Sequence, residues 1–153
     1  MRVWRICRKA FASDALSGRG GLFVAGRWHS KGHQVVYASS SLALAALELL
    51  VHADRTELPA DLIQVEIGVP DDVRIDRIER VELPRNWRDY PAPEALRRIG
   101  NQWLAGMATA ALQVPSAVIP EESNYLLNPL HADAQRIAVI QSAKFLYDPR
   151  LAN

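Results

Sequence analysis

The sequence of 153 residues contains a single cysteine and no long apolar run. One thiol, Cys7, cannot build a disulfide framework, so nothing in the sequence requires an oxidising compartment. Cys7 also lacks the spacing of a Cys/His metal site, and we expect it to be a small core residue of a first strand. The opening residues MRVWRICRK lack the apolar region of a signal peptide, and no stretch is long enough to span a bilayer. These absences predict a cytoplasmic protein.

Acidic residues are scarce in the first 40 residues, where seven Lys or Arg stand against one Asp. Over residues 41–153 the balance reverses, with eleven Lys or Arg against sixteen Asp or Glu. A basic N-terminal third can attract a ligand that carries phosphate, although solvated surface charges explain the same composition. No basic run contains interleaved aromatic residues and no helix-turn-helix pattern is present. We therefore expect no direct binding of nucleic acid.

Several common catalytic motifs are also missing. No Gly-x-Ser-x-Gly elbow surrounds Ser116, so a hydrolase nucleophile is not expected there. The glycines do not form the Gly-x-Gly-x-x-Gly pattern of a Rossmann site. The histidines have no metal-ligand spacing, so we expect no metal site; they are His29, His33, His52 and His131.

Short strands and two helices are the expected elements. Hydrophobic residues make up 49% and charged residues 23% of a chain whose length fits one globular domain. Apolar patterns predict strands over residues 3–7, 34–38, 61–69, 73–78 and 114–119, and a closing pair over 136–142 and 145–147. Apolar spacing predicts helices over residues 42–52 and 94–107, the first of them after the N-cap candidates Ser39, Ser40 and Ser41.

The segments between these elements favour loops. Residues 17–26 contain four glycines, residues 84–93 contain three prolines, and residues 124–128 lead into a turn at Pro129. The strand over residues 73–78 alternates apolar and charged residues and is expected at an exposed edge. Since no regular strand–helix–strand rhythm is present, we predict an α+β fold with a mostly antiparallel β core and flanking helices.

Glu48 does not fit its surroundings. It is the only charged residue across residues 35–51. The helix predicted over residues 42–52 is apolar on every face, and such a helix is normally buried. A carboxylate is almost never fully buried without a partner. Glu48 therefore either faces a cavity or pairs with a cation such as Arg5 or Arg27, and the sequence leaves both options open.

Three further residues are ambiguous when taken alone. Tyr37 ends a predicted strand and is either core filler with a satisfied hydroxyl or a platform for a substrate. Arg27 follows the glycine-rich loop, where an arginine is a surface residue in most proteins. Ser116 has the alternative role of bonding the backbone around it.

Five stretches of the chain resemble the RES domain family, which is named for its Arg, Glu and Ser. In chain order they are RVWRIC at 2–7, GRWHSKG at 26–32, VVYASSSLALAALELLVH at 35–52, VPSAVIPEESNYLLNP at 114–129 and FLYDPRL at 145–151. His29 stands where the family usually has Asn. Because the resemblance runs from end to end in the right order, it implies a single RES domain over residues 1–153.

This resemblance implies a fold like that of ADP-ribosyltransferases of the diphtheria-toxin type. It implies the toxin half of a type II toxin–antitoxin pair, an enzyme that cleaves the nicotinamide–ribose bond of NAD, with NAD as substrate and no cofactor. The implied partner is an Xre-like helix-turn-helix antitoxin that covers the active site, in a complex that contains a toxin dimer. By motif, the implied catalytic residues are Arg27, Tyr37 and Glu48, and the further NAD contacts are Arg5, Ser116 and Asn128.

These residue types suit that chemistry. Nicotinamide is a cationic leaving group, so the difficulty is the positive charge that develops on the ribose, and Glu48 would stabilise it. Arg27 would hold the pyrophosphate and Tyr37 would orient the nicotinamide ribose. Two alternatives stay open: ADP-ribose is passed to a protein side chain or to phosphate, or the domain is a non-catalytic module that holds a partner segment in the same pocket.

Overall fold

The computed structural model describes residues 1–54 and 58–151, so the end of the predicted domain at residue 153 lies outside the described residues. Within these ranges seven strands form one sheet in the order β4-β5-β6-β2-β1-β3-β7. Only β4 and β5 are parallel, which confirms the mostly antiparallel α+β class. The strands are β1 (Arg2–Arg8), β2 (Val36–Ser39), β3 (Leu62–Gly68), β4 (Ile75–Arg77), β5 (Ala111–Pro115), β6 (Ser123–Leu127) and β7 (Ala138–Phe145).

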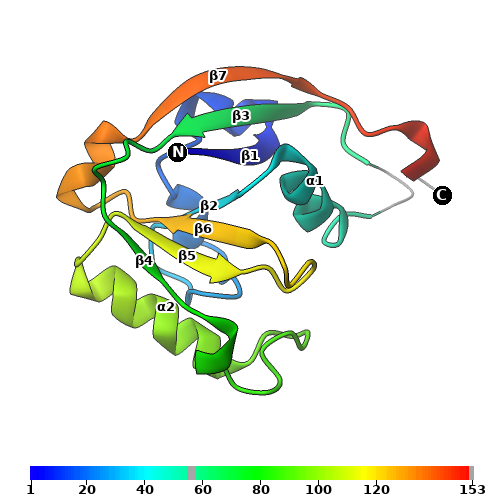
Figure 1. The fold of residues 1–153 in the computed structure, drawn as a ribbon. Coiled ribbons are helices and arrows are strands. Elements are labelled where there is room, and N and C mark those ends of the chain that lie inside the picture. The colour runs from blue at the N-terminus through cyan, green and yellow to red at the C-terminus, as the bar shows by residue number, and fades with distance from the viewer. Residues whose placement is uncertain (55–57, 152–153) are drawn as a thin grey trace.

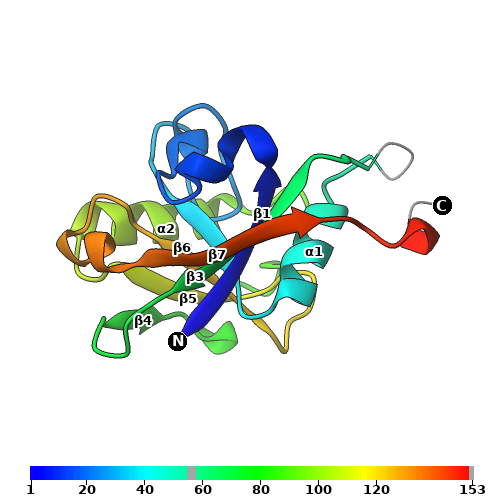
Figure 2. The same cartoon turned by 90° about the horizontal axis from the view of Figure 1, so that it is seen from above.

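The sheet divides between β1 and β2. One register pair, Trp4 with Ser39, joins these two strands in the described chain, whereas β1 pairs with β3 along its whole length. Strands β1, β3 and β7 form an upper layer, and β2, β6, β5 and β4 form a lower layer that diverges from it (Figure 1). Seen from above, β7 crosses β1 at a steep angle, as expected of a strongly twisted sheet (Figure 2).

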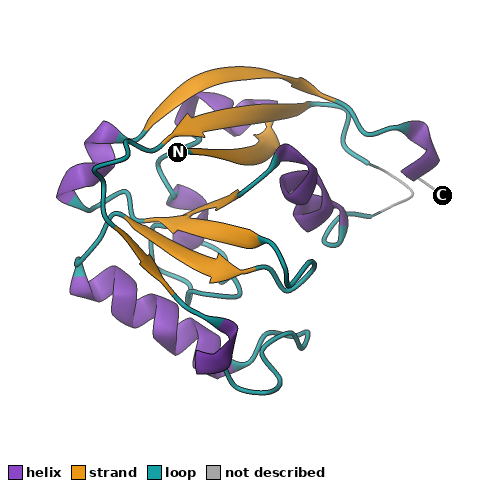
Figure 3. Cartoon of the chain, viewed as in Figure 1, coloured by secondary structure: helices purple, strands orange, loops and turns teal. Residues whose placement is uncertain are grey.

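The two longer helices occupy different places in this arrangement. Helix α1 (Leu42–Leu50) lies at the end of the molecule where the two layers diverge, and α2 (Glu94–Gly106) lies along the lower layer (Figure 3). The remaining helical turns are short 3-10 segments at Lys9–Asp14, Arg19–Leu22, Arg80–Glu82, Ala132–Arg136 and Pro149–Leu151. Within the described residues no helix has the length and apolarity needed to cross a membrane.

Apolar residues are buried in two clusters, one on each face of the lower layer. Leu127 belongs to the cluster between the layers, together with Val36 and Val65. Its neighbour Leu126 belongs to the cluster under α2, together with Leu96. Successive side chains of a strand point to opposite faces, so β6 is covered on both sides. The lower layer is therefore a rigid support for any site built on its edge.

Several predicted elements are confirmed. Cys7 is buried in β1, β4 lies at an edge of the sheet, and α2 covers the range predicted for the second helix to within one residue. Ser41 is the N-cap of α1, and its side chain accepts a hydrogen bond from the Leu44 N–H.

The predicted burial of the first helix is wrong. α1 ends at Leu50, and only Leu44 and Ala45 are buried in it, while Leu47 is 37% exposed. The helix sits at the open end of the molecule and packs with one face, so its outer face meets solvent in spite of its apolar composition.

Three strand predictions near the C-terminus are also wrong. The strand predicted over 114–119 is β5, which ends at Pro115, and residues 124–128, predicted to lead into a turn, largely form β6. The two strands predicted over 136–142 and 145–147 are replaced by one strand, β7. It pairs with β3, and the register shifts between Glu66 and Ile67 of β3. Apolar runs of this length do not specify a register, and the pairing with distant strands decided the boundaries.

Gly100 is the closest approach between α2 and the loop that carries Arg27. A methyl group at Gly100 would lie 1.6 Å from the carbonyl oxygen of Trp28. Helix and loop therefore touch through backbone atoms at this point. A residue larger than glycine at position 100 would not fit between them.

We expect Gly100→Ala to lower the free energy of unfolding by roughly 1–3 kcal/mol, because the added methyl group forces helix and loop apart. Chemical denaturation followed by circular dichroism measures this change. Gly106→Ala is the matched control, since nothing lies within 4 Å of a methyl group at that end of the same helix. Equal stabilities of the two variants would contradict the prediction.

Candidate active site

A cavity of about 560 Å³ opens where β1 and β2 diverge, and we call it the central pocket. Its volume lies within the range typical of small-molecule sites. Its walls come from β1, β2, β5, β6, α1, α2, the glycine-rich loop and the connector over residues 84–93. The lining side chains that bear on its chemistry are Arg5, Arg27, Tyr37, Glu48, Arg97 and Asn124.

Glu48 lies on α1 and faces the central pocket. One oxygen, Oε1, accepts a hydrogen bond of 2.7 Å from Ser116 Oγ and one of 2.5 Å from Asn124 Nδ2. Among the described residues no ion pair joins Glu48 to Arg5 or Arg27, so the option of a cavity is confirmed over that of a salt bridge. Both donors are neutral, so they orient the carboxylate, which interacts with the charge of Arg27 without an ion pair among the described residues.

The two donors are themselves fixed by the surrounding strands. Ser39 Oγ donates to Asn124 Oδ1 at 2.7 Å, which turns the amide nitrogen of Asn124 toward Glu48. Ser39 and Asn124 face each other across β2 and β6. Ser116 is fully buried, and its oxygen accepts the N–H groups of Val118 and Ile119, which leaves its proton for Glu48.

The hydroxyl of Tyr37 is satisfied by protein groups, and its role as a platform for a substrate stays a prediction. Its ring lines the pocket, and its hydroxyl lies 2.7 Å from His29 Nδ1 and 3.2 Å from the Trp28 N–H. His29 Nε2 contacts the Val24 carbonyl at 3.0 Å, so the imidazole proton sits on Nε2 and Nδ1 accepts. The Tyr37 hydroxyl therefore donates to His29 and accepts from Trp28. Burial raises the pKa of Tyr37 far above its usual value and lowers that of His29.

Arg27 links the pocket to the connector. Its Nη1 donates to the Trp87 carbonyl at 2.7 Å and its Nη2 to the Asp89 carbonyl at 3.2 Å. Burial lowers the pKa of Arg27, while the charges of Glu48 and Asp89 act in the opposite direction. A guanidinium has five N–H donors, so Arg27 keeps donors for a ligand after binding these two carbonyls.

Two more arginines line the same pocket. Arg5 on β1 donates from Nη1 to the Tyr37 carbonyl at 3.1 Å, and its buried Nε has no hydrogen-bond partner in the described chain. Burial lowers the pKa of Arg5 below its ordinary value. Arg97 on α2 donates from Nε to the Gly26 carbonyl at 3.1 Å. Together with Arg27 they give the pocket a positive wall opposite one carboxylate.

The structure brings Arg5, Arg27, Tyr37 and Glu48 together, with Ser116 directly behind Glu48. It does not bring Asn128 to the pocket. Asn128 is buried beyond the end of β6, where Nδ2 donates to the Leu104 carbonyl at 3.2 Å and Oδ1 accepts from the Leu130 N–H at 3.1 Å. Its contacts are those of a turn residue.

Sequence reasoning missed Asn124, Ser39 and Arg97. Asn124 stands four residues before Asn128 in the quoted serine stretch, and a strand assignment there would have placed it opposite Ser39. For Arg97 the sequence gave no indication, because it is one of two successive arginines on an amphipathic helix.

The fold and the site define an α+β domain with a single carboxylate in an arginine-lined pocket. The chain belongs to the RES domain family, whose model matches residues 2–148.

Named relatives match the chain over nearly all of its length. The chain is 43% identical to the "Prs ADP-ribosylating toxin" of Sphingobium sp., over 97% of this chain and 94% of that protein. It is 42% identical to "Toxin Res" of Pseudomonas putida and 37% identical to "Toxin Res" of Yersinia enterocolitica, each over 99% of both chains.

A solved structure shares the fold at low sequence identity. A chain of the M. tuberculosis MbcT-MbcA toxin-antitoxin complex superposes with a TM-score of 0.77 at 17% identity. The match covers 99% of this chain and 86% of that chain. The same arrangement of strands and helices therefore persists where most residues differ.

The neutral state of His29 predicts a pH dependence of stability. Burial lowers the pKa of His29 in the folded chain, so the unfolded chain binds more protons once the pH falls below about 6.5. The contribution of His29 to the free energy of unfolding is therefore lost as the pH falls below that value. We expect the fall in Tm between about pH 7 and pH 5 to be smaller in His29→Asn than in the wild type.

Differential scanning calorimetry over this pH range tests the expectation. Gln102→Ala, which removes an exposed side chain without a titratable group, is the control and should follow the wild type. If Tm falls with pH by the same amount in the wild type and in His29→Asn, the buried imidazole does not contribute to the pH dependence of stability.

Proposed function

We propose that this chain is the toxin of a toxin–antitoxin pair and that it cleaves the bond between nicotinamide and ribose in NAD. The observation that carries the proposal is Glu48, a carboxylate held by two neutral donors in a pocket lined by Arg5, Arg27 and Arg97. The names of the relatives, all of them toxins, support the biological role.

The chemistry follows from the charges. The bond between ribose C1 and the nicotinamide nitrogen breaks, and its electron pair leaves with nicotinamide, which becomes neutral. Positive charge develops on the ribose, and the carboxylate of Glu48 stabilises it in a partly enclosed site where charges interact strongly. A water oxygen then bonds to C1 and releases a proton, so that the products are nicotinamide and ADP-ribose.

The other pocket residues would position the substrate. Arginines recognise phosphate oxygens well, and Arg27 with Arg5 or Arg97 would hold the two phosphates. The hydroxyl of Tyr37 is already bonded to protein groups. Its contribution is therefore the ring, which would pack against the nicotinamide ribose and fix its orientation.

The second candidate function is transfer of ADP-ribose to a protein. The relative from Sphingobium sp. is named an ADP-ribosylating toxin, and the same carboxylate serves either acceptor. Mass spectrometry of the reaction separates the outcomes: ADP-ribose for water, its phosphate ester for phosphate, and a modified chain for a protein acceptor. A pocket that binds a partner but never releases nicotinamide would be a non-catalytic module.

We propose an antitoxin as the partner. Support comes from the structural neighbour, which is a toxin–antitoxin complex, and from the family resemblance. The finer proposal is a cytoplasmic assembly in which an Xre-like helix-turn-helix antitoxin covers the central pocket of a toxin dimer. NAD is the substrate, and the proposed reaction uses no cofactor or metal.

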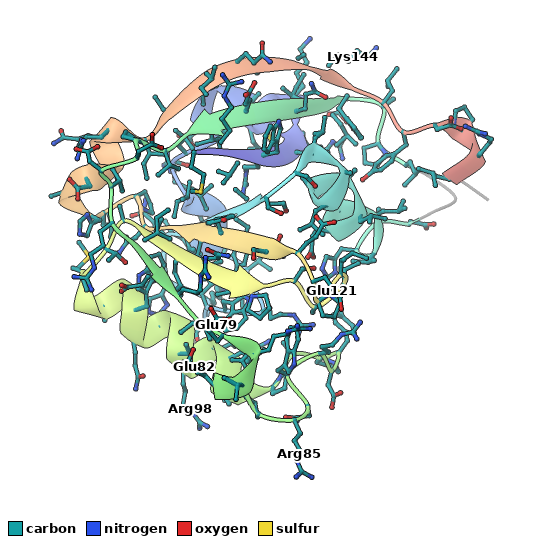
Figure 4. The ribbon with its side chains drawn as sticks, viewed as in Figure 1. Glu79, Glu82, Arg85, Arg98, Glu121 and Lys144 are labelled. Carbon is teal, nitrogen blue, oxygen red and sulfur yellow. The ribbon has the colours of Figure 1, made fainter. Side chains whose placement is uncertain are left out.

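Glu48→Gln should lower the rate of nicotinamide release by about 10²–10³-fold, because the glutamine keeps the hydrogen-bond acceptor and loses the charge. Purified protein freed of antitoxin is incubated with NAD, and free nicotinamide is followed. Glu121→Gln is the control, since its exposed side chain lies on the turn between β5 and β6 (Figure 4). Wild-type turnover in folded Glu48→Gln would rule out the assignment of Glu48.

Arg27→Ala should weaken NAD binding roughly 10- to 100-fold, the range expected when a charged hydrogen-bond donor is removed. Calorimetry in the Glu48→Gln background measures affinity without turnover. Arg98→Ala is the control, because Arg98 is exposed and points away from the sheet (Figure 4). Unchanged affinity in Arg27→Ala would mean that this arginine serves only to anchor the connector.

A further inference from the structure

Two aromatic side chains from different segments meet at the wall of the central pocket. His52 follows the end of α1, and Tyr90 belongs to the connector over residues 84–93. Their ring centroids lie 6.2 Å apart with an interplanar angle of 47°, and both line the pocket. Tyr90 is 81% exposed, so most of its ring is open to a ligand.

The position of this pair is fixed relative to Glu48. His52 lies four residues after Glu48, and the N–H groups of Val51 and His52 continue the turn that begins inside α1. Residues four apart on a helix lie on the same side about one turn from each other. His52 therefore lies about one turn beyond Glu48, just after the C-terminal end of α1, and both residues line the pocket.

Arg27 lines the same pocket and is bonded to the connector that carries Tyr90. It donates to the carbonyl of Asp89, the residue directly before Tyr90, and its pKa responds to the charge of Glu48 as well as to that of Asp89. The pocket thus contains a carboxylate, a guanidinium and an exposed aromatic ring, and the guanidinium is bonded to the residue next to the ring. A dinucleotide carries the groups that match these three: a reactive ribose, phosphates and a second base.

We propose that Tyr90, supported by His52, forms a subsite for the adenine base of a dinucleotide. The inference rests on the proposed function, in which NAD is the substrate. The base stacks on the open face of Tyr90, while His52 covers part of the other side and holds the ring in place. A base and an aromatic side chain attract each other through their faces, which suits a subsite without buried polar groups.

The test compares NAD with nicotinamide mononucleotide, which has the bond to be cleaved but no adenosine. We expect Tyr90→Ala to lower the ratio of kcat/KM for NAD to that for the mononucleotide roughly 5- to 100-fold. Tyr90→Phe keeps the ring and should restore the ratio. Arg85→Ala is the control on the same connector, because Arg85 is exposed and projects away from the body of the protein (Figure 4).

A binding experiment separates this inference from the proposed function. ADP-ribose, which carries adenine and both phosphates but no nicotinamide, is titrated into wild type and Tyr90→Ala by calorimetry. Weaker binding to Tyr90→Ala supports the subsite even if the wild type releases no nicotinamide, a result that would overturn only the proposed reaction. Equal binding by both proteins, absence of binding to the wild type, or an equal loss with NAD and the mononucleotide overturns the subsite.

Discussion

The hydrogen bonds that Ser116 and Asn124 donate to one oxygen of Glu48 join α1 to the lower layer of the sheet. Glu48 belongs to α1, while the two donors belong to the lower layer, at the end of β5 and on β6. Between the layers, β1 and β2 share one register pair in the described chain. The pocket opens at this divergence, and the position of its carboxylate depends on α1 and the lower layer keeping their places.

The other site residues are anchored in the same way, by bonds to the protein that leave one surface for a ligand. The Tyr37 hydroxyl is held by Trp28 and His29, and its ring lines the pocket. Arg27 holds the connector through two carbonyls and keeps further donors. Each group is therefore oriented before a ligand arrives, which lowers the cost of ordering it on binding. The glycine-rich loop and the connector, both predicted as loops, are held in place by these bonds and form walls of the pocket.

The basic N-terminal third has two explanations, and the structure supports both. Arg5 and Arg27 line the central pocket, as attraction of a phosphate-bearing ligand requires. Arg2 and Arg8 instead form ion pairs with Glu66 and Asp61. The pair of Arg8 with Asp61 is exposed on both sides and contributes little stability, whereas Glu66 is buried. Composition indicated the excess of positive charge but not which arginines face the site. For the arginines of β1, this depends on the side of the strand to which each side chain points.

The sequence by itself determined the α+β class, both longer helices, and the presence of one charged residue in an apolar stretch, since these follow from local composition and spacing. It also brought Arg27, Tyr37 and Glu48 together through family motifs. Only the tertiary structure decided that Glu48 faces a cavity and that Asn124, rather than Asn128, bonds to it. The pairing of β6 with β2 and β5 sets both facts, because Asn124 lies within β6 opposite Ser39 while Asn128 lies beyond the end of the strand. Contacts between residues far apart in the sequence, such as Asn124 and Glu48, depend on how strands and helices pack against each other. Local sequence patterns carry no information about that packing.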